Sequence, residues 1–323
     1  GGAEINLSRG GAVNFENLIG TSAGEVVRGD NGDNVLSGKG GADTIYGGNG
    51  NDTLYADSLS EFNGSPNASS TSTNDELYGE VGDDTLVGSA GDNTLDGGTG
   101  ADILITGNGS DTIVLRAGDG GSDEASADTI TDFTDGADVL GLAGGLQYSQ
   151  LTIDQGSGDY ANDTIVSVTS TSEYLAVLQG ISASDVNYLD FTSTATGDQS
   201  FTGTTGDGVF IGAAGNDTAT TNTGSDVVLT HAGDDSITVD GAGDKTIDGG
   251  TGTDSLTIDL AGHTTLTDFE ISYSNNEFTF TDQSSNTLRL KNLENYTIGS
   301  NSYVQWDDTS INSGDGGARN SFW

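Results

Sequence analysis

Acidic and amide side chains recur in this chain every nine residues, in the same local sequence each time. Consecutive segments read GDNGDNVLS from Gly29, GKGGADTIY from Gly38 and GGNGNDTLY from Gly47. In each segment the fourth residue is Gly, the sixth is Asp or Asn, and the eighth is Leu or Ile. Four more segments keep this register over residues 79–114. The period therefore brings one oxygen-bearing side chain to the same position of every repeat.

A third run of repeats begins near Gly203 and is looser. Its sixth positions are Asp in most repeats, and its eighth positions are apolar. One extra residue lies between Ile237 and Ile247, and Lys245 occupies a position that should be acidic. This irregularity predicts a bulge and a missing site at Lys245.

The recurring oxygens have the chemistry of a calcium site. Asp carboxylates, together with the carbonyl groups of Gly-rich turns, are hard ligands that suit the coordination of Ca²⁺ by about six to eight oxygens. The chain has two His and no Cys, which are too few of the nitrogen and sulfur ligands that zinc prefers. The alternative is an acidic turn face that is merely solvated. We expect multiple Ca²⁺ ions, held by Asn34, Asp43, Asp52, Asp75, Asp84, Asn93, Asp102, Asp111, Asp128, Asp217, Asp226, Asp235 and Asp254.

Residues eighteen apart are expected to share an ion. Asp84 with Asp102 is the cleanest such pair, and Asp217 with Asp235 is the best in the third run. Two further sets contain Asn, which contributes no charge, and should bind more weakly. These sets are Asn34 with Asp52, and the column of Asp75, Asn93 and Asp111.

The elements that position these residues follow from the same period. Gly allows positive φ and tight turns, and the x-U-x triplet that follows, where U is apolar, makes a short strand with one side chain pointing inward. Two nonapeptides per coil give an all-β fold of two parallel β-rolls, each followed by a β-rich capping segment. Stacked carboxylates about 4 Å apart repel by about 4 kcal/mol at an effective dielectric constant of about 20, so a cation is needed between them.

Composition excludes several functions. The 323 residues include 50 Asp and Glu against 8 Lys and Arg, for a net charge of −42. Phosphate neutralisation needs clustered cations, so no nucleic-acid partner is expected. The longest apolar run, residues 174–178, is far shorter than the about 20 residues of a membrane-spanning helix. No membrane insertion is expected.

The nonapeptides GGNGNDTLY and GGTGADILI resemble those of the RTX, or haemolysin-type calcium-binding, family. FENLIGTSAGEVVRGD, from Phe15, resembles the lead-in before the first repeat, with Glu25 already in phase. DTITDFTDGADVLGL resembles the segment that caps the roll in serralysin-type proteins, and this likeness implies edge ligands at Asp128, Asp132 and Asp138. The resemblance also implies type I secretion from a Gram-negative bacterium and folding outside the cell, where calcium is abundant.

Five segments are expected along the chain. A lead-in and the first roll take residues 1–116, with a loop insertion at 57–74, and a β-rich cap takes 117–199. The second roll takes 200–258 and a C-terminal β cap takes 259–305. Residues 306–323 form a tail whose last residues resemble the end of a secretion signal.

We find no catalytic constellation in the sequence, and no enzyme activity is expected. GTSAG, from Gly20, matches the nucleophile-elbow pattern but lies in a degenerate repeat without a histidine partner. His231 and His263 have no catalytic companion and are expected to be solvent-exposed.

Three functions remain open. The first is an extracellular or cell-surface structural protein that assembles head-to-tail with itself into a surface layer, sheath or filament. RTX surface-layer proteins, which this composition resembles, support it. The second is the secretion and folding module of a larger exported enzyme. The third is an adhesin that binds glycans or a surface, for which a cell-surface polysaccharide is a candidate partner.

Overall fold

The structure is a computed structural model that describes residues 4–6, 17–57, 73–307 and 310–313. Most of the expected insertion at 57–74 and most of the expected tail at 306–323 lie outside the described residues. The chain forms two compact units. One contains the residues up to Leu146 and residues 150–192, and the other contains residues 147–149 and the residues from Ser193 on.

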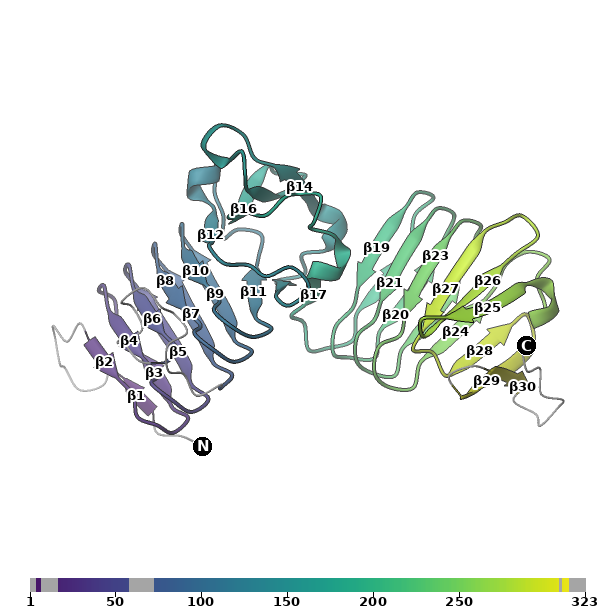
Figure 1. Cartoon of the computed structure of the whole chain (residues 1–323), viewed down its shortest axis with the longest axis horizontal. Coiled ribbons are helices and arrows are strands. Elements are labelled where there is room, and N and C mark those ends of the chain that lie inside the picture. Colours follow the sequence, from purple (N-terminus) through teal and green to yellow (C-terminus); the bar gives the residue numbers. More distant parts are fainter. Residues whose placement is uncertain (1–3, 7–16, 58–72, 308–309, 314–323) are drawn as a thin grey trace. The chain divides into compact units, whose positions relative to one another are not determined.

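The first unit has two sheets whose strands alternate along the chain (Figure 1). One sheet has the order β1 (Glu4–Asn6), β3 (Val26–Arg28), β5 (Thr44–Asn49), β7 (Glu76–Val81), β9 (Thr94–Thr99), β11 (Thr112–Leu115), β13 (Val139–Leu142) and β17 (Phe191–Ser193). The other has the order β14 (Leu151–Gln155), β15 (Thr164–Val168), β16 (Glu173–Leu178), β12 (Asp128–Ile130), β10 (Ile103–Ile105), β8 (Thr85–Val87), β6 (Thr53–Tyr55), β4 (Val35–Ser37) and β2 (Asn17–Ile19).

Strands of successive coils pair in parallel, at the expected offset of eighteen residues within each uninterrupted run of repeats. Val27 pairs with Ile45 in one sheet, and Leu36 pairs with Leu54 in the other. The eighth residue of each repeat points inward, as expected. The fully buried side chains are Leu36, Ile45, Leu54, Leu77, Leu86, Leu95, Leu104 and Ile113. The fold is therefore an all-β parallel β-roll, and no α-helix occurs among the described residues.

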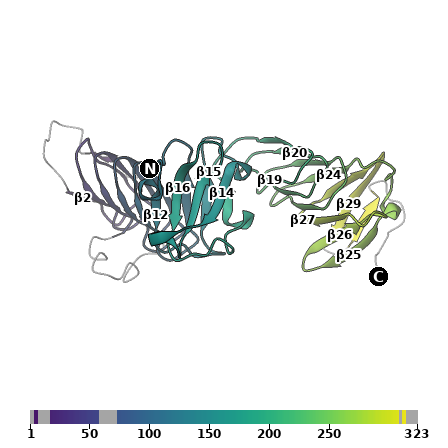
Figure 2. The ribbon, with the colours of Figure 1, turned by 90° about the horizontal axis from the view of Figure 1, so that it is seen from above.

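Three antiparallel strands extend one sheet of the first unit beyond the repeats. β14 pairs with β15 and β15 with β16, both antiparallel, and β16 then pairs in parallel with β12 (Figure 2). The repeat sheet is thus continued by strands with a different pattern. Short 3-10 helices lie in the connections: η2 (Glu124–Ser126), η3 (Tyr148–Gln150), η4 (Gly158–Tyr160) and η5 (Tyr188–Asp190).

The second unit repeats the two-sheet arrangement. One sheet has the order β18 (Ser200–Thr202), β20 (Thr218–Thr221), β22 (Ser236–Val239), β24 (Ser255–Ile258), β28 (Asn295–Ile298), β29 (Asn301–Asp307) and β30 (Ser310–Ser313). The other has the order β19 (Gly208–Ile211), β21 (Asp226–Leu229), β23 (Lys245–Asp248), β27 (Thr287–Lys291), β26 (Glu277–Thr281) and β25 (Glu270–Ser274). The 3-10 helix η6 (Leu266–Asp268) precedes β25.

The extra residue of the second unit lies in a turn. Asp226 pairs with Lys245 and Leu229 with Asp248, an offset of nineteen that is constant along β21 and β23. The strands therefore continue without a bulge, and the prediction of a bulge is wrong for them. The physical reason is that the Gly-rich turn over residues 240–244 takes up the added length, which leaves the strand register intact.

No helix among the described residues is both long and apolar enough to cross a membrane.

Candidate metal sites in the turn columns

The sixth-position side chains form three columns, each stacked along one side of a unit. In every column the backbone N–H of one member donates to a side-chain oxygen of the next, over 2.6 to 3.0 Å. The first column is Glu25, Asp43, Asp75, Asn93, Asp111 and Asp138. The second is Asn34, Asp52, Asp84, Asp102 and Asp128. The third is Gln199, Asp217, Asp235, Asp254 and Glu294.

Asp84 shows the geometry of a typical member. Its Oδ1 accepts from the N–H of Asp52 at 2.6 Å, and its own N–H donates to Oδ1 of Asp102 at 2.7 Å. The residue is 1% exposed. One carboxylate oxygen is thus used to join consecutive coils, which leaves the other oxygen inside the turn.

That second oxygen has no hydrogen-bond partner in the part of the chain that the structure describes. The same is true of a set of column members: Oδ2 of Asp43, Asp52, Asp84, Asp102, Asp111, Asp235 and Asp254. A buried acceptor without a partner is unfavourable by about 1–3 kcal/mol, and by more when it is charged. So many unpaired oxygens at equivalent positions indicate a missing positive charge at each of them.

Gly at the first position of the repeat gives this oxygen its space. A Cβ on Gly79 would lie closer than 3.0 Å to Oδ2 of Asp84, and a Cβ on Gly97 would lie equally close to Oδ2 of Asp102. At Gly79 and Gly97 the close approach of the carboxylate to the backbone therefore leaves no space for a Cβ.

Burial of these carboxylates disfavours their charge. Desolvation raises the pKa of Asp84 from 3.8 to about 7, and the neighbouring Asp102 adds to the shift. Desolvation likewise raises the pKa of Asp52 and Asp111 to about 7. In the absence of a cation the charged form of these carboxylates is therefore disfavoured, and a nearby divalent ion would favour it.

Asn93 shows what the turn carbonyls require. Its Nδ2 occupies the place of the carboxylate Oδ2 and donates to the carbonyl oxygens of Gly88 at 3.0 Å and Gly91 at 3.1 Å. These backbone oxygens therefore face the same point as the unpaired carboxylate oxygen of the Asp repeats. A point lined only by oxygens is suited to a hard cation.

The ligand set fits calcium if backbone carbonyl groups supply most of the oxygen ligands. Among the described residues no three Asp, Glu or His side chains converge on one point. Because Ca²⁺ takes about six to eight oxygens, backbone carbonyls must supply most of them. The Gly-rich turns hold such carbonyls beside each carboxylate, so the residues present fit the ion.

The structure brings the expected pairs together. Asp84 lies beside Asp102, and the N–H of Asp217 donates to Asp235 at 2.6 Å. The expected column of Asp75, Asn93 and Asp111 and the pair of Asn34 with Asp52 are likewise in register. Whether each residue binds an ion stays a prediction.

Two expected residues differ from the rest, and two column members, Gln199 and Glu294, were missed. Asp226 belongs to none of the three columns and instead lies 3.0 Å from the Nζ of Lys245. Asp132 accepts from the N–H of Thr106 at 2.8 Å, at the edge of the first column. Glu294 was missed because it lies forty residues beyond Asp254, after the β25–β26 hairpin, where no period marks it.

The prediction that both histidines are solvent-exposed is wrong. The Nε2 of His231 is buried, and burial lowers its pKa. The ring of His263 stacks on Phe269 at 4.9 Å between centroids, and the side chain is only 18% exposed. Phe269, the residue after η6, stacks on the ring of His263, and sequence spacing does not reveal this contact.

Comparison with known proteins agrees with the repeat pattern. Four segments match the RTX calcium-binding nonapeptide repeat, at residues 19–58, 70–104, 78–113 and 202–237. The family model thus matches in four copies, each spanning several nonapeptides, and the resemblance inferred from the nonapeptides is confirmed. Calcium is the ion that this repeat family binds.

Two solved structures are similar at low identity. The AlgE6R3 subunit of the Azotobacter vinelandii mannuronan C5-epimerase matches at 21% identity over 54% of this chain and 80% of that one, with a TM-score of 0.21. The extracellular lipase LipA of Serratia marcescens matches at 12% identity over 89% of this chain and 40% of that one, with a TM-score of 0.19. No curated protein sequence matches.

Proposed function

We propose that this chain is a secreted structural protein that folds outside the cell when its turn columns bind several Ca²⁺ ions, and that it then assembles with further copies. The observation that carries the proposal is the set of buried, unpaired Oδ2 atoms repeated at equivalent positions of both units. The calcium-binding repeat at four places along the chain supports the choice of ion.

The column Asp residues with an unpaired Oδ2 have two tasks. One oxygen of Asp84 accepts a backbone hydrogen bond from the preceding coil, which fixes the stacking of coils. The other oxygen, with the carbonyls of its turn, would hold the ion, whose charge offsets the repulsion between successive carboxylates. The same side chains therefore bind the ion and join the coils, which couples folding to metal binding.

Secretion is consistent with this coupling. RTX repeats are typical of proteins that act outside the cell, and a chain that needs calcium to neutralise its columns stays unfolded where calcium is scarce. The net charge of −42 adds to the repulsion that opposes compaction without the ion.

Assembly is proposed from sheet edges that no other described strand covers. β1 and β2 are the outermost strands at the N-terminal end of the two sheets in the first unit, and Ile19 of β2 is 53% exposed. Unpaired edge groups of this kind are able to pair with a strand of another copy. A head-to-tail contact that does not close gives a filament or lattice.

The test uses the full chain in about 5 mM Ca²⁺, in the same concentration of Mg²⁺, and in excess chelator. We expect a β-type circular dichroism spectrum and ordered polymers in electron microscopy with Ca²⁺ only. A fold that persists unchanged in chelator would overturn the calcium-dependent part. Folded monomers at every calcium concentration would overturn the assembly part and favour the module of a larger exported protein.

A further inference from the structure

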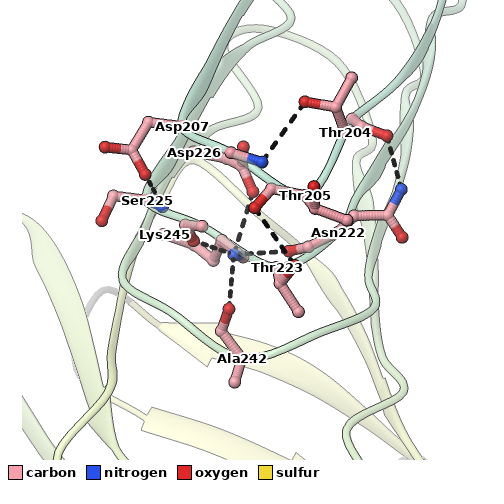
Figure 3. Close-up of polar contacts among 12 residues, drawn as sticks. Thr204, Thr205, Asp207, Asn222, Thr223, Ser225, Asp226, Ala242 and Lys245 are labelled. Carbon is pink, nitrogen blue, oxygen red and sulfur yellow. Dashed lines mark hydrogen bonds and ion pairs between the residues drawn. The ribbon is translucent and has the colours of Figure 1, made fainter.

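The second unit has another series of sixth-position residues, which contains a lysine where most members of the three columns are acidic. Lys245 is the sixth residue of its repeat, opposite Asp226 in the adjacent coil. It is 1% exposed, and its side chain and that of Asp226 are both fully buried. Nζ of Lys245 lies 3.0 Å from Oδ2 of Asp226 (Figure 3).

Backbone oxygens complete the surroundings of this ammonium group. Nζ donates to the carbonyl of Asn222 at 2.8 Å, to that of Gly224, and to that of Ala242 at 3.5 Å (Figure 3). Asn222 and Gly224 belong to the turn before Asp226, and Ala242 belongs to the turn of the next coil. One carboxylate and three carbonyl groups from two consecutive turns thus face one positive charge.

The same turn position faces a hydrogen-bond donor elsewhere in the chain. Gly224 is the fourth residue of its repeat, as Gly91 is in the repeat of Asn93, and both have positive φ. The carbonyl of Gly91 accepts from the Asn93 amide at 3.1 Å, whereas the carbonyl of Gly224 accepts from Lys245. The fourth-position carbonyl therefore lines the point where the unpaired carboxylate oxygens of the other columns lie.

We propose that the ammonium group of Lys245 replaces a calcium ion in the second unit, so that this turn closes without metal and Asp226 is not a calcium ligand. The inference rests on the proposed binding of calcium by the other three columns. A calcium ion would be a second cation at this carboxylate, whose Oδ2 the ammonium group already pairs.

A tethered cation has a consequence for calcium dependence. The ammonium group is present at every calcium concentration, since it is part of the chain. β21 and β23, which flank the ammonium group, should therefore stay paired when calcium is withdrawn. β22 and β24 should lose their pairing, because they follow the turns in which Asp235 and Asp254 have unpaired oxygens.

The first experiment counts ions bound to the full chain by native mass spectrometry and equilibrium dialysis with Ca²⁺. Lys245→Asp restores the acid of the repeat and should raise the count by one. Lys291→Gln is the control, because it removes a lysine that pairs with Asp248 at 2.8 Å but is 45% exposed. It should leave the count unchanged. An unchanged count in folded Lys245→Asp would overturn the inference.

The second experiment uses the unaltered chain and stays decisive if Lys245→Asp fails to fold. Hydrogen exchange is followed while calcium is withdrawn with a chelator. Amides of β21 and β23 should retain at least about tenfold more protection than amides of β22 and β24. Equal loss of protection in both pairs would overturn the inference alone, whereas a chain that binds no calcium at all would overturn the proposed function and this inference with it.

Discussion

Replacing Asp84 by Asn should change stability in opposite directions with and without calcium. The amide retains an oxygen for the N–H of Asp52, which now donates to Oδ1 at 2.6 Å. Its nitrogen replaces the unpaired Oδ2 and faces the carbonyls of its own turn, as Nδ2 of Asn93 does in the neighbouring repeat. The substitution therefore removes an unpaired buried acceptor and a charge without changing the shape of the side chain.

The magnitudes follow from these contacts. Without calcium, removing the unpaired buried oxygen should stabilise the fold by about 1–3 kcal/mol. With calcium, the variant loses a charged ligand. At a free calcium concentration of about 100 to 1,000 times the Kd of the site, a variant that no longer binds this ion should lose about 3–4 kcal/mol of the stabilisation by calcium.

The assay is urea unfolding followed by circular dichroism, in chelator and in calcium. All samples contain the same concentration of trimethylamine N-oxide, which favours the folded state enough for the unfolding of the metal-free chain to be measured. Asp83→Asn is the matched control, because Asp83 is the exposed neighbour whose Oδ1 accepts from the N–H of Ala101 at 3.0 Å. The reasoning is refuted if Asp84→Asn lowers stability in chelator, or if it behaves like Asp83→Asn in both conditions.

Three further predictions concern the same columns. Asn93→Asp should lower the calcium concentration at the folding midpoint by about tenfold, because it adds a charged ligand; calcium titration followed by circular dichroism measures it, and an unchanged midpoint would contradict it. Burial raises the pKa of Asp52 from 3.8 to about 7, so the free energy of unfolding in chelator should be greatest below about pH 4 and should fall as the pH rises through about 7. Calcium affinity, measured by calorimetry, should rise over the same range. A urea unfolding midpoint in chelator that rises with pH would contradict this prediction. Gly79→Ala should destabilise the fold by about 3 kcal/mol or more in urea unfolding, since its Cβ would overlap the Asp84 carboxylate, whereas Gly197→Ala, with nothing within 4 Å, should change little.

The coil and its core were predictable because the sequence period defines them. A repeat of nine residues with two repeats per coil requires an offset of eighteen, and Val27 pairs with Ile45 at that offset. The apolar eighth residue was expected to point inward, and Leu86 is fully buried. The same period places Asp84 beside Asp102, as the hydrogen bond between them shows.

Contacts that join segments of different pattern were not predictable. Glu294 follows a hairpin of ordinary alternating strands, so no spacing connects it to Asp254, although the N–H of Asp254 donates to it at 2.7 Å. The stacking of His263 on Phe269 likewise joins residues that no repeat spacing relates. At Lys245 the sequence indicated a lost acid, but not that the side chain turns inward onto three backbone carbonyls.

The sixth position of the repeat solves one electrostatic problem in three ways. The carbonyls of each turn point inward and require a positive charge or a donor. Asn93 supplies a neutral donor, Lys245 supplies a full charge within the chain, and the Asp residues add a further negative group that only an external cation offsets. Replacing Asp by Asn or Lys at this position should therefore reduce the number of ions that folding requires, and the mixture of the three residue types sets how strongly each part of the chain depends on calcium.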